Sequence, residues 1–379
     1  MADRYRRRLY ELLRSFYMGV LAEDYFEDSA EQRLYRKIYF ETFRHLGFIE
    51  KCLRQLYKEL PGPDLRAALA LGASQILFMD DIPDYAAVNE SVTLVQPNKK
   101  SFVNAVLRNL IRRKEEFQAN YSVREDFPGW FVKRWEKRLG EDLEAFLYDL
   151  NTKPSFYGIN RDTMVLEKLE ERSDNYIMDK ASFAIAKLAG DCTPMSVLDC
   201  CAAPGGKTFV LSETYPDARI FAVEKNPARF EKLKENMAGM GLGNVDCVNS
   251  DIMELKTEAE FDLVLLDAPC TAIGTIKRHP EVRWFRNLDS LRENGALQLE
   301  MLKKVSTFIS KGGIIIYSVC SMEPEETTDV IEAFLKHDSS FQVIEPSCDA
   351  EFKNGKYFLS LPYKNDSDGF FGAVLTKNF

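Results

Sequence analysis

Apolar residues recur at three- and four-residue spacing from Arg4 to about Leu150, with few stretches of strand-like alternation. This period is typical of amphipathic helices. Asp64 and Asp84 can each cap a helix, and Ser101 can start a third. The pattern therefore predicts an all-helical domain over residues 1–150.

The pattern changes after a polar stretch at residues 151–154, Asn-Thr-Lys-Pro, which indicates a boundary. Short apolar runs then alternate with helical stretches, at Val197–Cys200, Ile220–Glu224, Val245–Val248, Phe261–Leu266 and Ile314–Ser318. Such alternation predicts βαβ units and a mostly parallel sheet. Phe341–Ile344 and Gly372–Thr376 are expected to form an antiparallel hairpin at one edge. We therefore divide the chain into a helical domain (1–150), a connecting segment (151–190) and an α/β domain (191–379).

Length and composition restrict the class of protein. The chain has 379 residues, 45% of them hydrophobic, which is enough for two or three domains. No apolar run approaches the ~20 residues of a membrane span, and the N-terminus lacks the apolar stretch of a secretory signal, so a cytoplasmic location without membrane is expected. With three histidines and no Cys-x-x-Cys among eight cysteines, neither a metal site nor a disulfide framework is expected.

Charge alone gives an ambiguous indication of partners. The net charge of −9 is not typical of a nucleic-acid-binding protein, but phosphate contacts depend on local lysines and arginines. Between Pro97 and Arg138 there are 11 basic and 5 acidic residues. This excess could follow a polyanion backbone, and a solvated helix face explains it equally well.

A glycine-containing loop, Cys201–Thr208, follows the first predicted strand and opens a helix. Glycines there let the backbone approach a ligand. A phosphate-binding P-loop would need glycine at position 201, and a dinucleotide fingerprint would need Gly-x-Gly; neither fits Gly205-Gly206. A plain structural turn remains the simplest alternative at this point.

Acids and cysteines follow the next predicted strands. Glu224, Asp251 and Asp267 end three successive strands, and Cys270 and Cys320 follow the fourth and fifth. Because parallel strands place their carboxyl ends along one crevice, these residues are expected to converge. A single strand-end acid is more often a helix cap, and a free cysteine is more often a buried apolar residue. Three acids beside a glycine loop favour a nucleoside-containing cofactor.

Three motifs make the prediction specific. Val-Leu-Asp-Cys-Cys-Ala-Ala-Pro-Gly-Gly-Lys-Thr at 197–208 resembles the cofactor motif of the Sun-type RNA (cytosine-C5) methyltransferases. Residues 267–272, Asp-Ala-Pro-Cys-Thr-Ala, and residues 317–326, from Tyr317 to Glu326, resemble the two cysteine motifs of that family. Residues 276–284 most resemble the branch that acts on 16S rRNA, and Leu71–Leu110 resembles the NusB-like RNA-binding domain found in front of it.

This resemblance implies a Rossmann-like class I methyltransferase domain with a seven-stranded, mostly parallel sheet, preceded by the all-α NusB-like domain. It implies RNA, and 16S rRNA in particular, as the partner of a monomeric enzyme. S-adenosylmethionine is expected to be held by Cys201, Ala202, Ala203, Pro204, Gly205, Gly206, Lys207, Glu224, Asp251 and Asp267. By the same resemblance Cys320 is the nucleophile, Cys270 assists product release, and residues 368–371 form the final motif near the active site.

The chemistry explains the need for these groups. Cytosine C5 becomes nucleophilic when a thiolate adds to C6, and a base must later remove the C5 proton. Asp267 can bond to the base near N3. Spacing alone leaves open which cysteine attacks, because DNA cytosine methyltransferases use the cysteine of a Pro-Cys pair, as in Pro269-Cys270. The resemblance assigns the attack to Cys320.

The chain also departs from the family pattern. The segment between Asn160 and Asp179 is far shorter than the RNA-contacting subdomain expected there, and Val319 replaces the threonine before the nucleophile. Residues 277–280, Lys-Arg-His-Pro, are expected in a loop where a target base or phosphate could lie. A competing interpretation is an RNA-binding or assembly protein that has lost turnover, against which the intact cysteine pair argues.

Overall fold

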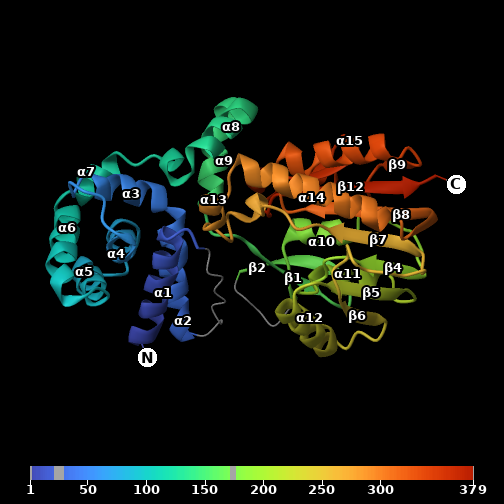
Figure 1. Ribbon diagram of the computed structural model, residues 1–379, viewed down its shortest axis with the longest axis horizontal. Coiled ribbons are helices and arrows are strands. Elements are labelled where there is room, and N and C mark those ends of the chain that lie inside the picture. The colour runs from blue at the N-terminus through green and yellow to red at the C-terminus, as the bar shows by residue number, and fades with distance from the viewer. Residues whose placement is uncertain (1, 21–29, 171–175, 379) are drawn as a thin grey trace. The chain divides into compact units, whose positions relative to one another are not determined.

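The computed structural model describes residues 2–20, 30–170 and 176–378 (Figure 1). The chain divides into two compact units, Met1–Asn151 with His279–Phe285 and Thr152–Arg278 with Arg286–Phe379. We call them the helical unit and the sheet unit.

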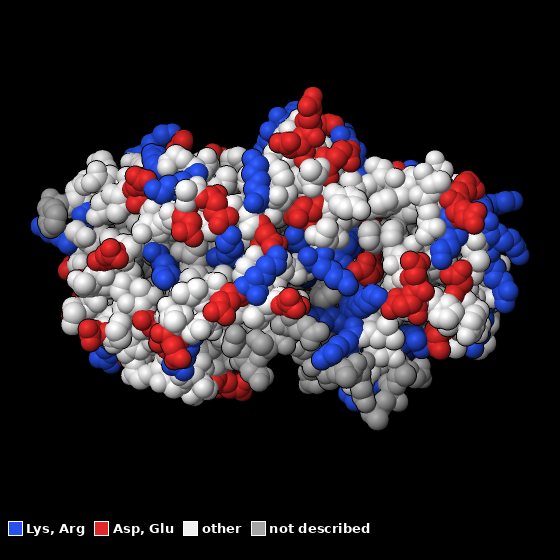
Figure 2. Space-filling model, turned by 180° about the vertical axis from the view of Figure 1, so that it is seen from behind, with Lys and Arg blue, Asp and Glu red and all other residues white. Residues whose placement is uncertain are grey.

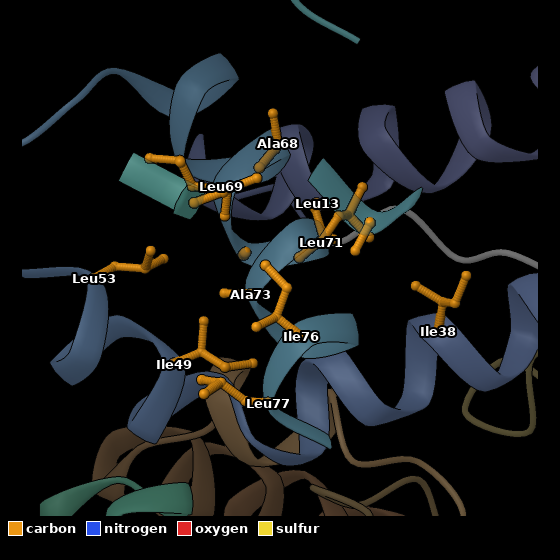
Figure 3. Close-up of a cluster of buried hydrophobic side chains, with 14 of the residues drawn as sticks. Leu13, Ile38, Ile49, Leu53, Ala68, Leu69, Leu71, Ala73, Ile76 and Leu77 are labelled. Atoms are coloured by element: carbon orange, nitrogen blue, oxygen red, sulfur yellow. The ribbon is translucent and has the colours of Figure 1, made fainter. Parts of the chain in front are cut away.

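The helical unit contains the helices that the three- and four-residue period predicts. They are α1 (Ala2–Tyr17), α2 (Ala30–Arg44), α3 (Leu46–Arg54), α4 (Pro63–Phe78), α5 (Asp84–Thr93), α6 (Lys100–Arg112), α7 (Lys114–Ala119), α8 (Gly129–Leu139) and α9 (Leu143–Leu150). Every residue of α4 from Ala67 to Leu77 is buried. Leu69, Ile76 and Leu77 meet side chains of the surrounding helices there (Figure 3). A helix that is apolar on all sides must lie inside its unit, which explains this central place.

The predicted helix starts are wrong by a residue or more. The N-caps of α4, α5 and α6 are Gly62, Pro83 and Lys99. Asp64 and Asp84 lie in the first turns of their helices instead. An acid in the first turn still interacts favourably with the positive end of the helix dipole. The two aspartates therefore mark the beginnings of α4 and α5, although neither is the N-cap.

A short segment from the later part of the chain completes the helical unit. His279–Phe285, with the helix α13 (Val282–Phe285), belongs to it. Arg283 is 1% exposed, and Trp284 donates a hydrogen bond from Nε1 to the main-chain oxygen of Phe43 (2.8 Å). Residues 277–280 lie in a turn before α13, outside helices and strands, as the sequence predicts. A target base or phosphate near this turn stays a prediction.

The sheet unit is built on a nine-stranded sheet of order β10-β11-β12-β8-β7-β4-β5-β6, with β9 paired to β12. Its strands are β4 (Ser196–Asp199), β5 (Arg219–Glu224), β6 (Val245–Asn249), β7 (Phe261–Asp267), β8 (Ile309–Val319), β9 (Phe341–Ile344), β10 (Lys353–Asn354), β11 (Tyr357–Ser360) and β12 (Phe370–Lys377). The five strands β4 to β8 are parallel to their neighbours, whereas β12 is antiparallel to β8. The seven predicted strands are present, but β10 and β11 were not predicted, and they separate β9 from β12 in sequence.

Helices cover both faces of this sheet (Figure 1). They are α10 (Lys180–Ala186), α11 (Gly206–Thr214), α12 (Pro227–Met240), α14 (Leu288–Ser306), α15 (Thr328–His337) and α16 (Pro362–Asn365). Val264 and Leu266 of β7 share one core with α14 and α15, whereas Leu263 and Leu265 share another with α10 and α11. Because alternate residues of a strand point to opposite faces, a continuous apolar run fills both cores.

The connecting segment contains a small sheet of its own. Its strands, in the order β2-β1-β3, are β1 (Phe156–Asn160), β2 (Val165–Leu169) and β3 (Tyr176–Ile177). Asp179 then caps α10 by accepting hydrogen bonds from the backbone N–H groups of Ala181 and Ser182. The shortened segment is thus structured within residues 156–169 and 176–177, and it belongs to the sheet unit.

Candidate active site

The predicted catalytic residues lie near one another at the carboxyl ends of three neighbouring parallel strands, β4, β7 and β8. Asp199 ends β4 opposite Leu265 of β7, and Asp267 ends β7 opposite Ser318 of β8. The cysteine motifs continue from β7 and β8. Such strand ends form the ligand crevice of an open α/β sheet.

A lysine and an aspartate form the polar centre of this site. Lys207 Nζ lies 2.7 Å from Oδ2 of Asp267, and Ser318 Oγ donates to Oδ1 of the same carboxylate (2.6 Å). The Lys207 side chain is 13% exposed and that of Asp267 is 27% exposed. Burial alone lowers the pKa of Lys207, but the charges of Asp267, Cys320 and Asp199 raise it above its usual value. The site therefore holds a permanent ammonium group beside a partly accessible carboxylate.

The two predicted cysteines meet at this place. Cys270 Sγ lies 3.1 Å from Cys320 Sγ, and both residues are partly exposed. The contact with Cys320 and burial raise the pKa of the Cys270 thiol well above its usual value. Cys270 therefore keeps its proton, while Lys207 interacts electrostatically with the sulfur of Cys320. The two thiols lie in different electrostatic surroundings although they touch.

The loop between β4 and α11 is fastened from α12. Arg229 donates to the main-chain oxygen of Ala203 (2.6 Å), and Asn236 donates to that of Pro204 (2.7 Å). Gly205 has φ +109°, and a Cβ there would lie 2.4 Å from Met237 Cε. Only glycine adopts this backbone at no steric cost, so Gly205 is required for the turn and for packing on α12. The sequence interpretation assigned Gly205 to cofactor binding and kept a plain structural turn as the alternative.

Cys201 sits in the same loop and is poorly suited to attack. Burial and the carboxylates of Asp267, Asp199 and Glu224 raise the pKa of its thiol. A protonated thiol is a weak nucleophile. Cys201, with Ala202 and Ala203, thus contributes packing and shape.

Asp199 is a feature that the sequence interpretation did not single out. Its Oδ2 accepts a hydrogen bond from Thr208 (2.7 Å), and its buried Oδ1 has no partner in the described part of the chain. Burial raises the pKa of Asp199 to about 7. A buried acceptor without a donor is costly, so a bound ligand that brings a donor fits here.

The other strand-end acids lie at the ends of β5 and β6. Glu224 is 5% exposed and accepts from the backbone N–H of Asn226 (2.8 Å). Asp251 accepts from the backbone N–H of Met253, and Lys225 lowers the pKa of its carboxyl by hydrogen bonding. Both carboxylates keep acceptor capacity for a nucleoside, and each also has a local partner, as a plain turn would provide.

Residues 368–371 are connected to the turn that contains Arg278 by an ion pair. Arg278 binds Asp368 (2.8 Å) and Asp179 (3.0 Å), which links the turn before α13 to the N-cap of α10. Phe370 and Phe371 are buried in the two cores, although the Lys207 ammonium lies 5.0 Å from the Phe370 ring. Arg278 is thus held by two carboxylates of the sheet unit.

Gly274 and Gly369 allow residues 368–371, the loop after β7 and the loop that carries Cys320 to lie in contact. Gly369 donates from its backbone N–H to the oxygen of Gly274 (2.8 Å), and Gly274 donates to the oxygen of Cys320 (2.9 Å). A Cβ on Gly274 would lie 1.8 Å from the oxygen of Gly369, so no other residue fits without a shift. The backbone of Cys320 is therefore fixed by residues from two other loops.

Two further observations concern other kinds of site. Across residues 2–20, 30–170 and 176–378, no group of three or more histidine, cysteine, aspartate or glutamate residues is arranged to hold a metal ion. Within the same ranges, no helix is long and apolar enough to cross a membrane.

Comparisons with known proteins agree with this architecture. Residues 190–376 match the family 16S rRNA methyltransferase RsmB/F, and residues 9–112 match the NusB family. Two relatives named ribosomal RNA small subunit methyltransferase B come from Serratia proteamaculans (28% identical, 92% of this chain and 91% of the relative) and Proteus mirabilis (29%, 92% and 90%). The crystal structure of PH0851 shares the fold over 99% of both chains (TM-score 0.77, 22% identical). A methyltransferase homologue from Pyrococcus horikoshii does so over 75% of this chain and 100% of its own (TM-score 0.55, 22% identical).

The fold, the strand-end site and these matches define the class: the chain is an S-adenosylmethionine-dependent RNA methyltransferase. More particularly, it belongs to the RsmB/F family of 16S rRNA methyltransferases and carries a NusB-family domain ahead of the catalytic one.

Proposed function

We propose that this enzyme methylates C5 of a cytosine in 16S rRNA through a covalent bond between Cys320 and C6 of the base. The observation that carries the proposal is the pair of thiols 3.1 Å apart beside Lys207 and Asp267. The rRNA substrate is inferred from the RsmB/F family and from the names of the relatives.

Cys320 begins the reaction. Its thiolate, stabilised by the nearby Lys207 ammonium, adds to C6 and shifts an electron pair towards C5. Asp267 accepts a hydrogen bond from an N–H group of the base and orients the ring, while Ser318 and Lys207 hold the carboxylate in place. S-adenosylmethionine, when bound, supplies the electrophilic methyl group.

Cys270 acts at the end of the reaction. After methylation a base must take the C5 proton, so that the electron pair returns to the ring and the Cys320–C6 bond breaks. Cys270 contacts the sulfur that must leave, and its protonated thiol can donate to that sulfur as negative charge returns to it. This division of roles is supported by the different charges near the two thiols.

The cofactor is assigned to the crevice between the ends of β4, β5 and β6. The loop residues Cys201 to Lys207 would shape its wall, and Glu224 and Asp251 would accept hydrogen bonds from ribose and adenine. The unpartnered Oδ1 of Asp199 fits a ligand that carries a positive charge or a donor.

RNA binding by the helical unit is also part of the proposal. Arg108, Arg112, Lys133 and Lys137 are exposed in the basic stretch noted in the sequence. Figure 2 shows lysine and arginine side chains interspersed with acidic ones on one face of the molecule. The NusB-family match supports an RNA contact there. A cytoplasmic, monomeric enzyme remains a prediction.

Covalent capture tests the proposal. The full-length enzyme is incubated with S-adenosylmethionine and a 16S rRNA transcript that contains 5-fluorocytidine, and the adduct is resolved on a denaturing gel. Wild type should form the adduct, Cys320→Ala should not, and Cys270→Ala should remain trapped even on unmodified RNA. Cys247→Ala, on β6, is the control and should behave as wild type.

The reverse pattern for the two cysteines would exchange their roles. No adduct with any variant, together with no S-adenosylmethionine binding by calorimetry, would favour the non-enzymatic interpretation. Bisulfite sequencing of rRNA with and without the gene would identify the modified nucleotide.

A further inference from the structure

A buried glutamate joins the two cysteine loops. Glu326, at the end of a 3₁₀ turn (Pro324–Glu326), is fully buried. Its carboxylate accepts hydrogen bonds from the backbone N–H of Thr271 (2.7 Å), from the hydroxyls of Thr271 and Ser321, and from Nε2 of Gln298 (3.3 Å). Four donors converge on one carboxylate, which is the arrangement that stabilises a buried negative charge.

The positions of these donors are informative. Thr271 directly follows Cys270, and Ser321 directly follows Cys320. The two loops leave different strands, and Glu326 is bonded to both of them. Gln298 of α14 extends the connection by donating to the main-chain oxygen of Pro269 (2.9 Å), and Arg286 donates to that of Thr271 (2.8 Å). The sulfur-to-sulfur contact is thus supported by side chains from α14 and from the 3₁₀ turn.

We propose that Glu326 is a positioning residue that holds Cys270 and Cys320 at their reacting separation and, through its negative charge, keeps the proton on Cys270. The inference rests on the proposed function, in which the two thiols have different roles. Without the charge on Glu326, one of the causes that raise the pKa of the Cys270 thiol would be lost.

The electrostatics agree with this role. The groups that face Cys270 are Cys320, Glu326 and the phenol of Tyr317. After the contact with Cys320 and burial, the charges of Cys320 and Glu326 further raise the pKa of Cys270. Burial raises the pKa of Glu326 itself, while its hydrogen bonds to Ser321 and Thr271 oppose that shift.

The test compares Glu326→Gln with wild type in the full-length enzyme. Glutamine keeps an acceptor and the size of the side chain but removes the charge. Alkylation of each cysteine by iodoacetamide is followed across a pH series by mass spectrometry. The midpoint for Cys270 should move to lower pH by about half to one unit, so its alkylation near about pH 8 should rise roughly three- to tenfold. The kcat for methyl transfer should fall more than about tenfold while KM for S-adenosylmethionine changes less than about twofold.

Glu332→Gln, on the exposed side of α15, is the matched control and should change neither readout. A Glu326→Gln enzyme with the wild-type Cys270 profile would overturn the inference, whatever its kcat. Glu326→Ala removes all four acceptor contacts and should also abolish the trapped Cys270→Ala adduct; if it fails to fold, the Gln variant still decides. Because alkylation needs no methyl transfer, the result stands apart from the capture experiment, whose failure would count against the proposed function alone.

Discussion

Each unit of the molecule contains a buried cluster of charged side chains, but the two clusters differ in what their hydrogen bonds reach. In the helical unit, Arg283 and Asp126 make hydrogen bonds with other residues of that unit. In the sheet unit, Lys207 and Asp267 lie beside two partly exposed thiols. A perturbed ionisable group is therefore evidence for a site only where its surroundings leave room for a ligand.

The cluster of the helical unit fixes the segment 279–285. Arg283 donates to Asn151 Oδ1 (2.7 Å) and to the main-chain oxygen of Asp126 (3.0 Å), and its guanidinium lies 4.0 Å from the Phe127 ring centre. Asp126 accepts from His45 (2.8 Å) and Tyr121 (2.5 Å). Burial lowers the pKa of Arg283 to about 9. These partners belong to the helical unit, so the role of the cluster is structural.

Removing the carboxylate of the sheet unit should produce the largest effect on catalysis. Asp267→Asn keeps the shape but loses the ion pair with Lys207, and kcat should fall roughly 10²–10³-fold with little change in Tm. Single-turnover methyl transfer measures the loss. Asp246→Asn, an exposed acid on β6, is the control. A variant with full activity would place the chemistry elsewhere.

Removing the cation of the helical unit should instead cost stability. Arg283→Met leaves main-chain oxygens without their donor, and the free energy of unfolding should fall by about 3 kcal/mol in urea titrations. Methyl transfer per folded molecule should persist. Arg292→Met, exposed on α14, should change stability by less than about 0.5 kcal/mol. Lost activity at unchanged stability would contradict the structural role.

A substitution of Asp199 should change both the stability of the protein and its binding of S-adenosylmethionine. Because burial raises its folded pKa to about 7, its contribution to stability is present below the unfolded value and is lost as pH rises towards 7. Asp199→Asn should therefore stabilise the protein at about pH 8, by roughly 1–3 kcal/mol, and flatten the decline between about pH 4 and 7. Calorimetry should show weaker binding of S-adenosylmethionine. Unchanged binding would remove Asp199 from the cofactor site.

A substitution of His45 should have the smallest effect, and it should act on the free energy of unfolding. Burial lowers its pKa, but hydrogen bonds to Asp126 and Glu41 raise it above the usual value overall. The resulting stabilisation is present below the unfolded pKa and is lost as pH rises through the folded pKa. His45→Gln should remove this slope, worth less than about 1 kcal/mol, from urea titrations between about pH 5 and 8. A slope that persists would assign it to another group.

Much of the fold followed from the sequence because its patterns are local. Strand-length apolar runs predicted β4 to β9 and β12, and the helical period predicted the first domain. The short strands β10 (Lys353–Asn354) and β11 (Tyr357–Ser360) were missed, although Tyr-Phe-Leu at the start of β11 is itself a short apolar run. Helix starts were wrong because the N-caps of α4, α5 and α6 are Gly62, Pro83 and Lys99, without a capping side chain, so no cap residue marks their starts in the sequence.

The candidate site was predicted as a set of residues, without their partners. The motifs placed Lys207, Asp267, Cys270 and Cys320 at strand ends, and the structure brings these four together. Glu326 was part of a quoted motif but had no predicted role, since its donors come from residues 271, 298 and 321. No local spacing links those positions.

The sequence by itself determined the strands β4 to β9 and β12, which of their ends carry chemistry and which family the motifs resemble, because hydrophobic period and short motifs are properties of neighbouring residues. Only the tertiary structure decided that Arg283 is a structural cation, that Arg278 is held by two carboxylates, and that Glu326 joins both cysteine loops. These outcomes depend on burial and on contacts between distant segments, which set the free energy of a charge and do not follow from its place in the chain.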